Sequence, residues 1–336
     1  MKKIAILGTG SWATGLARVL NDNGHQVMMY GIDQSEIDDI NMRHCNYKYF
    51  KDVQLEEEIV ATTSLEETIE NADYILITIP TQFVRDTLLK IKPLLRQKIT
   101  VVNAAKGFDM NTNMRMSDTI RSVFTSDEIN PVVSLIGPSH AEEVVERILT
   151  AVCSVSLDEK TAQDVQKLFS NHYFRVYTSN DEIGAEYGAA YKNVIAVASG
   201  IIAGLGYGDN SRAALITRGL HEMSLYGVVK GAKRETYFGL TGIGDLVVTC
   251  SSVHSRNFQA GFDIGESNRA IDFMMHNTKT CEGVRTCKVI HDDVKSHDYG
   301  IETPIVDAVY SVLYENANPK EIVASLMMRD LKSEQL

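Results

Sequence analysis

The stretch KKIAILGTGSWATGLARVLNDNGHQVMMYGID, residues 2–33, contains the pattern Gly8-x-Gly10-x-x-Ala13 directly after an apolar strand and before a helix. In this pattern the first glycine permits a tight turn, the second lets the backbone approach a pyrophosphate, and the small third residue lets the helix pack against the strand. The amino end of the helix then faces the phosphates. The stretch therefore predicts a dinucleotide-binding unit that works with NAD(H) or NADP(H).

Asp33 closes the second strand of this unit, about twenty residues after the glycines, the spacing at which an acid binds the ribose hydroxyls. An ordinary solvated loop residue is an equally good interpretation of Asp33 from the sequence alone. Both interpretations stay open at this point.

Short β-branched runs alternate with amphipathic helical stretches from residue 3 to about residue 180, as in a parallel sheet covered by helices. We expect a helix over Phe83–Leu95. The expected strands are Ile4–Leu7, Gln26–Tyr30, Val60–Thr63, Tyr74–Ile79, Thr100–Asn103, Val132–Ile136, Ala151–Ser156 and Phe174–Thr178. Long helical stretches follow Asn180. We therefore predict an α/β Rossmann-type domain with a parallel-rich sheet over residues 1–180 and an all-α substrate domain over residues 181–336.

The composition excludes several classes of protein. A net charge of -11 would repel a phosphate backbone, so general nucleic-acid binding is not expected and an anionic substrate needs a dedicated basic pocket. The five cysteines contain no C-x-x-C pair, which favours reduced thiols and no metal site. The first apolar run, Ile4–Leu7, is too short for a signal segment or a membrane span, so we expect a cytoplasmic protein.

Five further segments carry a resemblance to one family. They are AAKGFD at Ala104–Asp109, GPSHAEEV at Gly137–Val144, AYKNVIAV at Ala190–Val197, GDNSRAALITRG at Gly208–Gly219 and GIGDLVVTCSSVHSRN at Gly242–Asn257. Together with the glycine pattern they resemble the bacterial type of NAD(P)-dependent glycerol-3-phosphate dehydrogenase, from Lys3 to about Arg329. The resemblance implies interconversion of dihydroxyacetone phosphate and sn-glycerol 3-phosphate for phospholipid synthesis, and a homodimer.

Reduction of a ketone by a nicotinamide needs a proton donor beside the carbonyl oxygen. Lys192 lies in the helical stretch GAAYKNVIAVASG, where partial burial would lower its pKa towards the range useful for proton transfer. A lysine in such a helix more often snorkels or pairs with an acid, but the resemblance makes Lys192 the proton donor and acceptor.

Two further residues are expected beside this lysine. Lys106 follows an apolar strand at the sheet edge where ligands bind, and would face substrate and nicotinamide; its other interpretation is an exposed loop lysine. Asp245 resembles the family's substrate-site acid and would orient Lys192 or bind a substrate hydroxyl, although a helix cap is also reasonable.

The glycine pattern and the resemblance together give the expected ligand contacts. The predicted catalytic residues are Lys192, Lys106 and Asp245. The predicted cofactor contacts are Gly8, Gly10, Ser11, Trp12, Asp33, Tyr49, Lys106, Ala141, Arg256, Thr280 and Glu282. The predicted substrate contacts are Lys106, Gly137, Ser139, Lys192, Asn193, Asp245, Ser255, Arg256 and Asn257. Taken alone, Ser255-Arg256-Asn257 is equally a helix start or a phosphate site, and Ser139 equally a ligand contact or a cap.

The chain departs from the family at two positions. Thr280 stands where the family commonly has valine, and Ile32 stands where relatives often carry a basic residue beside the adenosine 2′-phosphate. Arg43, Lys48 and Lys51 are nearby cations that would substitute for that base. The choice between NADH and NADPH therefore stays open.

Two other functions fit parts of the sequence. A Rossmann-type sensor would bind the nucleotide without turnover, but Lys106, Lys192, Asp245 and Arg256 occur together, which favours turnover. A 3-hydroxyacid or 6-phosphogluconate type of dehydrogenase shares the two-domain plan, but the segments at Gly208–Gly219 and Gly242–Asn257 favour the glycerophosphate interpretation.

Overall fold

A computed structural model describes residues 1–270 and 281–334 of the chain. These residues form two compact units. Unit 1 contains Met1–Glu186 and Phe238–Thr241, and unit 2 contains Tyr187–Tyr237 and the described residues from Gly242 onward. The chain passes from one unit to the other within the helix α8, Glu182–Gly204. The sequence placed the domain boundary near residue 180, just before this helix.

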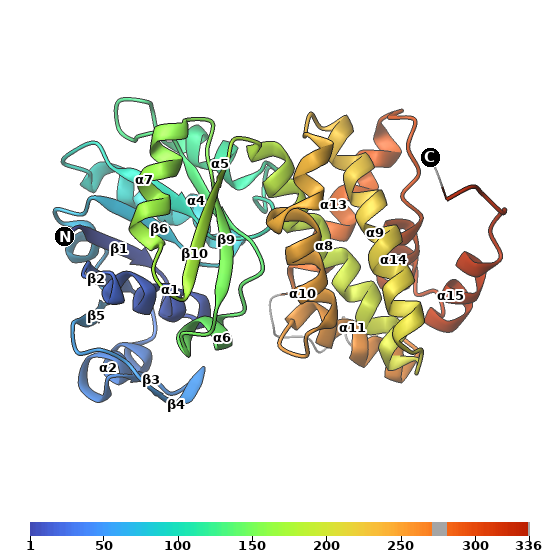
Figure 1. The fold of residues 1–336 in the computed structure, drawn as a ribbon, viewed down its shortest axis with the longest axis horizontal. Helices are drawn as coiled ribbons and strands as arrows, with labels where there is room; N and C mark the ends of the chain where they lie inside the picture. The colour runs from blue at the N-terminus through green and yellow to red at the C-terminus, as the bar shows by residue number, and fades with distance from the viewer. Residues whose placement is uncertain (271–280, 335–336) are drawn as a thin grey trace. The chain divides into compact units, whose positions relative to one another are not determined.

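Unit 1 is built on an eight-stranded sheet in the order β10-β9-β8-β7-β6-β1-β2-β5 (Figure 1). Neighbouring strands are parallel except for β8 and β9, which are antiparallel. The strands are β1 Lys3–Leu7, β2 Gln26–Tyr30, β5 Ile59–Thr62, β6 Tyr74–Ile77, β7 Thr100–Asn103, β8 Val133–Ile136, β9 Thr150–Val155 and β10 Phe174–Ser179. The predicted parallel-rich α/β fold is confirmed, and the ends of the eight expected strands agree to within two residues.

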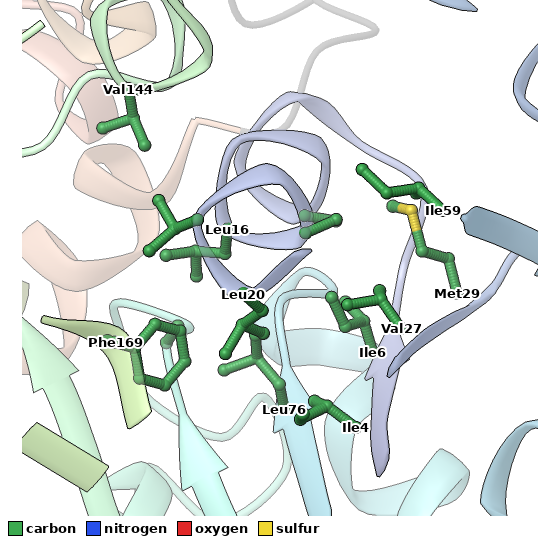
Figure 2. Close-up of a cluster of buried hydrophobic side chains, with 14 of the residues drawn as sticks. Ile4, Ile6, Leu16, Leu20, Val27, Met29, Ile59, Leu76, Val144 and Phe169 are labelled. Carbon is green, nitrogen blue, oxygen red and sulfur yellow. The ribbon is translucent and has the colours of Figure 1, made fainter. Parts of the chain in front are cut away.

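Helices cover both faces of this sheet. Alternate residues of each strand point to opposite faces, so strands such as β1 contribute to two buried clusters. In β1, Ile4 and Ile6 belong to one buried cluster, whereas Ala5 and Leu7 belong to another. The helices of the first face are α1 Ser11–Asp22, α2 Gln34–Arg43, α6 Ala141–Val145 and α7 Glu159–Phe169. The helices of the second face are α3 Leu65–Ile69, α4 Thr81–Ile91 and α5 Met116–Val123. Figure 2 shows Leu20 of α1 beside Leu76 of the sheet, and Leu16 of α1 on the side of Val144.

The structure differs from the expectations at two places, the end of one helix and one additional strand pair. The helix expected over Phe83–Leu95 is α4 from Thr81 to Ile91 followed by a 3-10 turn, Lys92–Leu94, because Pro93 has no N–H to continue the α-helical pattern. A small antiparallel pair, β3 Cys45–Asn46 and β4 Phe50–Gln54, was not expected. Its first strand is two residues long and carries no alternation of apolar and polar side chains that a pattern search could detect.

Unit 2 is helical, and its described residues contain no strand, which confirms the predicted all-α class for this part of the chain. After α8 its helices are α9 Asp209–Val229, α10 Asp245–Ser251, α11 Arg256–Ser267, α13 Glu282–Ser296, α14 Pro304–Tyr314 and α15 Pro319–Met327 (Figure 1). No helix of the described chain is long and apolar enough to cross a membrane.

Two glycine pairs bring α8 and α11 into backbone contact. Gly200 and Gly204 lie on α8, and Gly261 and Gly265 lie on α11. A Cβ built on Gly200 would lie 2.0 Å from a backbone oxygen of α11, and one built on Gly261 would lie 2.0 Å from a backbone oxygen of α8. Any side chain at these positions would therefore push the two helices apart.

The first turns of α8 are held in unit 1 by buried acids. Glu182 accepts two hydrogen bonds from the Arg121 guanidinium, at 2.8 and 2.6 Å. Glu186 accepts from the backbone N and the hydroxyl of Ser117, at 3.0 and 2.7 Å, and from the Ser134 hydroxyl at 3.0 Å. Burial raises the pKa of Glu186 to about 7, although its donors oppose the change.

The raised pKa of Glu186 predicts a pH-dependent stability for unit 1. Between its ordinary pKa of 4.5 and about 7, the folded chain holds a proton on Glu186 that the unfolded chain has released. The free energy of unfolding should therefore fall as the pH rises through this window, by at most about 1.4 kcal/mol per pH unit. Glu186→Gln should flatten this dependence. Urea titrations at pH 5 and pH 7.5, followed by fluorescence of the single tryptophan, Trp12, would measure it in unit 1.

Glu57→Gln, which removes an exposed carboxylate in the same unit, is the matched control and should keep the wild-type dependence. An identical pH dependence in wild type and Glu186→Gln would contradict the assignment.

Candidate active site

The carboxyl ends of the parallel strands bring the predicted residues of unit 1 to one edge of the sheet. β1 lies between β6 and β2, so the strand order reverses at β1, and open α/β sheets bind dinucleotides at such a reversal. Gly8 follows β1, Asp33 follows β2, Lys106 follows β7 and Gly137 follows β8. Within unit 1, two residues expected to contact the cofactor, Gly8 and Asp33, thus follow strands that end at the same edge as those before Lys106 and Gly137.

The glycine loop after β1 has the geometry that a pyrophosphate needs. Gly8 has φ +127°, a conformation that other residues avoid, and a Cβ there would lie 2.8 Å from Thr78 Oγ1. Gly10 precedes α1, and a Cβ there would meet nothing within 4 Å. No side chain caps the first turn of α1, and the buried Trp12 Nε1 has no hydrogen-bond partner. The uncapped backbone N–H groups of this first turn fit the phosphates of a nicotinamide dinucleotide.

Three predicted residues converge at the end of β8. Lys106 Nζ donates to the carbonyl oxygen of Gly137 at 3.0 Å, and the Ser139 hydroxyl donates to the same oxygen at 3.0 Å. Ala141 begins α6, and its backbone oxygen would lie 3.5 Å from a Cβ at Gly15 of α1. The ammonium and the hydroxyl therefore share one acceptor, and α6, which begins two residues after Ser139, contacts α1.

Lys192 and Asp245 form a buried pair in unit 2. Lys192 lies in the middle of α8 with 4% of its surface exposed, and Asp245 begins α10 with 0% exposed. The Nζ of Lys192 lies 2.5 Å from Asp245 Oδ1. A buried ammonium and a buried carboxylate at this distance satisfy each other's charge, which neither could do alone with so little of its surface exposed.

Thr249 is the residue of this site that the sequence analysis missed. Its hydroxyl oxygen accepts a hydrogen bond from Lys192 Nζ at 2.8 Å and donates its own proton to the backbone oxygen of Asp245 at 2.6 Å. The spacing could have indicated it, because Thr249 lies four residues after Asp245 and residues four apart face the same side of a helix.

The segment Ser255-Arg256-Asn257 begins α11. Ser255 is its N-cap and accepts from the backbone N of Phe258, whereas Arg256 is exposed. Asn257 Oδ1 accepts from the backbone N of Gly283 at 2.9 Å and from Cys281 Sγ at 3.0 Å. The segment is thus the helix start that one interpretation expected, and its guanidinium stays exposed to solvent.

Asn193 of α8 lies against the start of α13. Glu282 is the first residue of this helix, and a Cβ on the next residue, Gly283, would lie 2.4 Å from the backbone oxygen of Asn193. The helix that carries Lys192 therefore contacts α13 beside Glu282. Thr280 lies outside the described residues.

Asp33 is a helix cap rather than a plain loop residue. Its Oδ1 accepts from the backbone N of Ser35 at 3.0 Å and from the Ser35 hydroxyl at 2.7 Å, at the start of α2. Tyr49 lies in the turn between β3 and β4 with 42% of its surface exposed. Within the described chain, no group of three or more histidine, cysteine or acidic side chains is placed to hold a metal ion, and all five cysteines are free thiols.

Comparisons with known proteins agree with this geometry. Residues 3–162 match the model for the N-terminus of NAD-dependent glycerol-3-phosphate dehydrogenase, and residues 181–324 match the model for its C-terminus. Glycerol-3-phosphate dehydrogenase [NAD(P)+] from Streptococcus uberis is 44% identical over 333 residues, which cover 99% of this chain and 98% of the relative. The chain belongs to the NAD(P)-dependent glycerol-3-phosphate dehydrogenase family. The enzyme class and the nicotinamide cofactor expected from the sequence are confirmed.

Solved structures of glycerol-3-phosphate dehydrogenases share the fold over the whole chain. The enzyme from Coxiella burnetii has a TM-score of 0.89 and 33% identity, covering 98% of this chain and 99% of its own. The enzyme from Plasmodium falciparum has a TM-score of 0.87 and 25% identity, covering 99% and 97%. D-mandelate dehydrogenase, at 13% identity and a TM-score of 0.58, shares the fold alone.

The glycine loop predicts that Gly10→Ala preserves the fold and weakens cofactor binding. The backbone of Gly10 is extended and its Cβ would meet no protein atom, so the free energy of unfolding should change by less than about 0.5 kcal/mol. The new methyl group would face the pyrophosphate, and the Kd for NADH should rise at least about tenfold. Fluorescence titration with NADH would measure this Kd.

Gly8→Ala is the contrasting control, because its positive φ should cost about 1–3 kcal/mol of folding free energy. Unchanged NADH affinity in Gly10→Ala would place the pyrophosphate elsewhere.

Proposed function

We propose that this enzyme reduces dihydroxyacetone phosphate to sn-glycerol 3-phosphate for glycerophospholipid synthesis, with Lys192 as general acid and base. The buried pair of Lys192 and Asp245, 2.5 Å apart, is the observation that carries the proposal. We assign the cofactor to the domain of residues 1–180 and substrate binding mainly to residues 181–336. A homodimer and a cytoplasmic location stay predictions from the family resemblance.

The reduction needs a hydride at the C2 carbon and a proton at the C2 oxygen. The nicotinamide, when bound, supplies the hydride. Lys192 gives its Nζ proton to the oxygen as the C–H bond forms, and the resulting amine takes a proton from solvent before the next cycle. In the reverse direction the neutral amine removes the hydroxyl proton, so the same atom serves as acid and base.

Asp245 and Thr249 act by positioning this lysine. The Asp245 carboxylate balances the ammonium charge, and the Thr249 hydroxyl holds a second Nζ–H direction at 2.8 Å. Because Asp245 and Thr249 both lie on α10, one short helix fixes the proton donor from two sides. A fixed donor does not have to reorient during proton transfer, which lowers the barrier.

The start of α11 has the chemistry to hold the substrate phosphate. Arg256 offers a guanidinium that forms paired hydrogen bonds with phosphate oxygens, at the amino end of a twelve-residue helix. Ser255 uses its oxygen as a cap acceptor, so its hydroxyl proton can still donate to a phosphate. In unit 1, Lys106 and Ser139 supply a further ammonium and hydroxyl beside Gly137 for the substrate.

Removal of the proton donor is the direct test. Wild type should oxidise NADH or NADPH when dihydroxyacetone phosphate is added, as followed by absorbance at the nicotinamide band. Lys192→Ala should lower kcat by about 10²–10⁴-fold while NADH still binds, since it removes an acid and not a cofactor contact. Lys288→Ala, a change at an exposed lysine of α13, is the control and should keep wild-type turnover.

Lys192→Ala leaves the Asp245 carboxylate buried without its partner, at a cost of about 3–5 kcal/mol. The double variant Lys192→Met/Asp245→Asn removes both charges, restores stability and should stay inactive. Near-normal turnover in either variant would reject Lys192 as the acid, and no cofactor oxidation by wild type would reject the function.

Arg256→Ala should mainly weaken substrate affinity. A charge-assisted contact to phosphate contributes about 1.5–3 kcal/mol, so KM for dihydroxyacetone phosphate should rise by about 10–150-fold. Arg329→Ala is the control, because Arg329 is exposed and pairs with Glu302 near the carboxyl end. Steady-state kinetics would separate KM from kcat, and an unchanged KM in Arg256→Ala would place the phosphate at another site.

A further inference from the structure

The segment after β2 lies directly against the glycine loop. A Cβ built on Gly31 would lie 2.6 Å from Thr9 Cγ2, and Thr9 stands between the two loop glycines. The Thr9 hydroxyl also donates to the carboxylate of Glu36 on α2. Glu36, near the start of α2, is therefore bonded directly to the loop that is expected to bind the pyrophosphate.

These charges form a cluster of two carboxylates and one ammonium. Lys48 Nζ lies 2.5 Å from Glu36 Oε1 and 3.8 Å from Asp33 Oδ2. Hydrogen bonds from Ser35 lower the pKa of Asp33, and the hydrogen bond to Glu36 raises the pKa of Lys48. Asp33 and Lys48 are thus charged at neutral pH, and with the Glu36 carboxylate the cluster carries a net negative charge.

Two of the three cations that could contact a 2′-phosphate, Arg43 and Lys48, form ion pairs with acidic side chains. Lys48 pairs with Glu36, and Arg43 pairs with Asp39 at 3.1 Å within α2. Ile32, next to Asp33, exposes 87% of its surface and offers an apolar face in place of a cation. An adenine ring can lie against such a face, whereas a phosphate gains nothing from it.

We propose that this enzyme binds NADH in preference to NADPH, and that Asp33 sets the preference, in a cluster where the Asp33 and Glu36 carboxylates outnumber the Lys48 ammonium. The 2′-hydroxyl of NADH donates to the Asp33 carboxylate. The 2′-phosphate of NADPH would bring a charge of about −1.5 to −2 against the same carboxylate. The proposal rests on the proposed function only in placing the dinucleotide on the glycine loop.

The test measures binding without substrate. Trp12 lies at the start of α1, so titration of the full chain with NADH or NADPH, followed by quenching of its fluorescence, gives a Kd for each cofactor. Wild type should bind NADH at least tenfold more tightly than NADPH. Asp33→Asn should move the ratio of the two Kd values at least tenfold towards NADPH. Asparagine caps helices as well as aspartate does, so this variant should stay folded.

Asp38→Asn is the matched control, because it removes the same charge from the same helix at a residue whose side chain pairs with Gln34 instead. It should change the ratio of Kd values less than twofold. Equal Kd values in wild type, or an unchanged ratio in Asp33→Asn, would overturn the inference while leaving the proposed function intact. Binding of neither cofactor would overturn both.

Discussion

The parallel pairing of β1 with β2 and β6 is the constraint on which the cofactor site depends. Parallel strands end at the same edge of the sheet, so the loops that follow them must also gather there. Residues that are far apart in the sequence, such as Gly10, Asp33 and Lys106, reach one place for this reason. The helices that connect the strands bury both faces of the sheet and leave this edge for ligands.

Three buried titratable groups lie in the first half of α8, and each has a hydrogen-bond partner. Glu182 pairs with Arg121 and Glu186 accepts from Ser117 in unit 1, and Lys192 pairs with Asp245 in unit 2. Such pairs add little net stability compared with apolar contacts, but a helix that slides by one turn would leave several charges without partners. We infer that they fix the rotation and the axial position of the helix that carries the proton donor.

Much of the fold could be predicted from the sequence, because apolar β-branched runs and glycine positions are local signals. The eight strands of the large sheet are of this kind. The strand pair at Cys45 and Phe50 was missed because it is too short to leave a pattern, and the end of α4 was misplaced because a single proline, Pro93, decides it.

The site is different, since its geometry depends on contacts between distant residues. Lys192 and Asp245 are 53 residues apart, and nothing local in the sequence states that their side chains touch. Asp33 was left between two interpretations, and its observed bonds to Ser35 show that a cap can use one oxygen while the other faces Lys48. The residue type alone does not reveal that the two carboxylate oxygens of Asp33 make different contacts.

The glycine pairs between α8 and α11 have a consequence for substrate size. One of these helices carries Lys192 and the other begins with Arg256, and backbone atoms alone set the spacing between them. In the proposed site, the spacing between the backbones that carry the proton donor and the phosphate anchor is therefore set by these glycines and not by side-chain packing. A change in the spacing of these two helices, as a longer substrate would need, therefore requires substitution of the glycines.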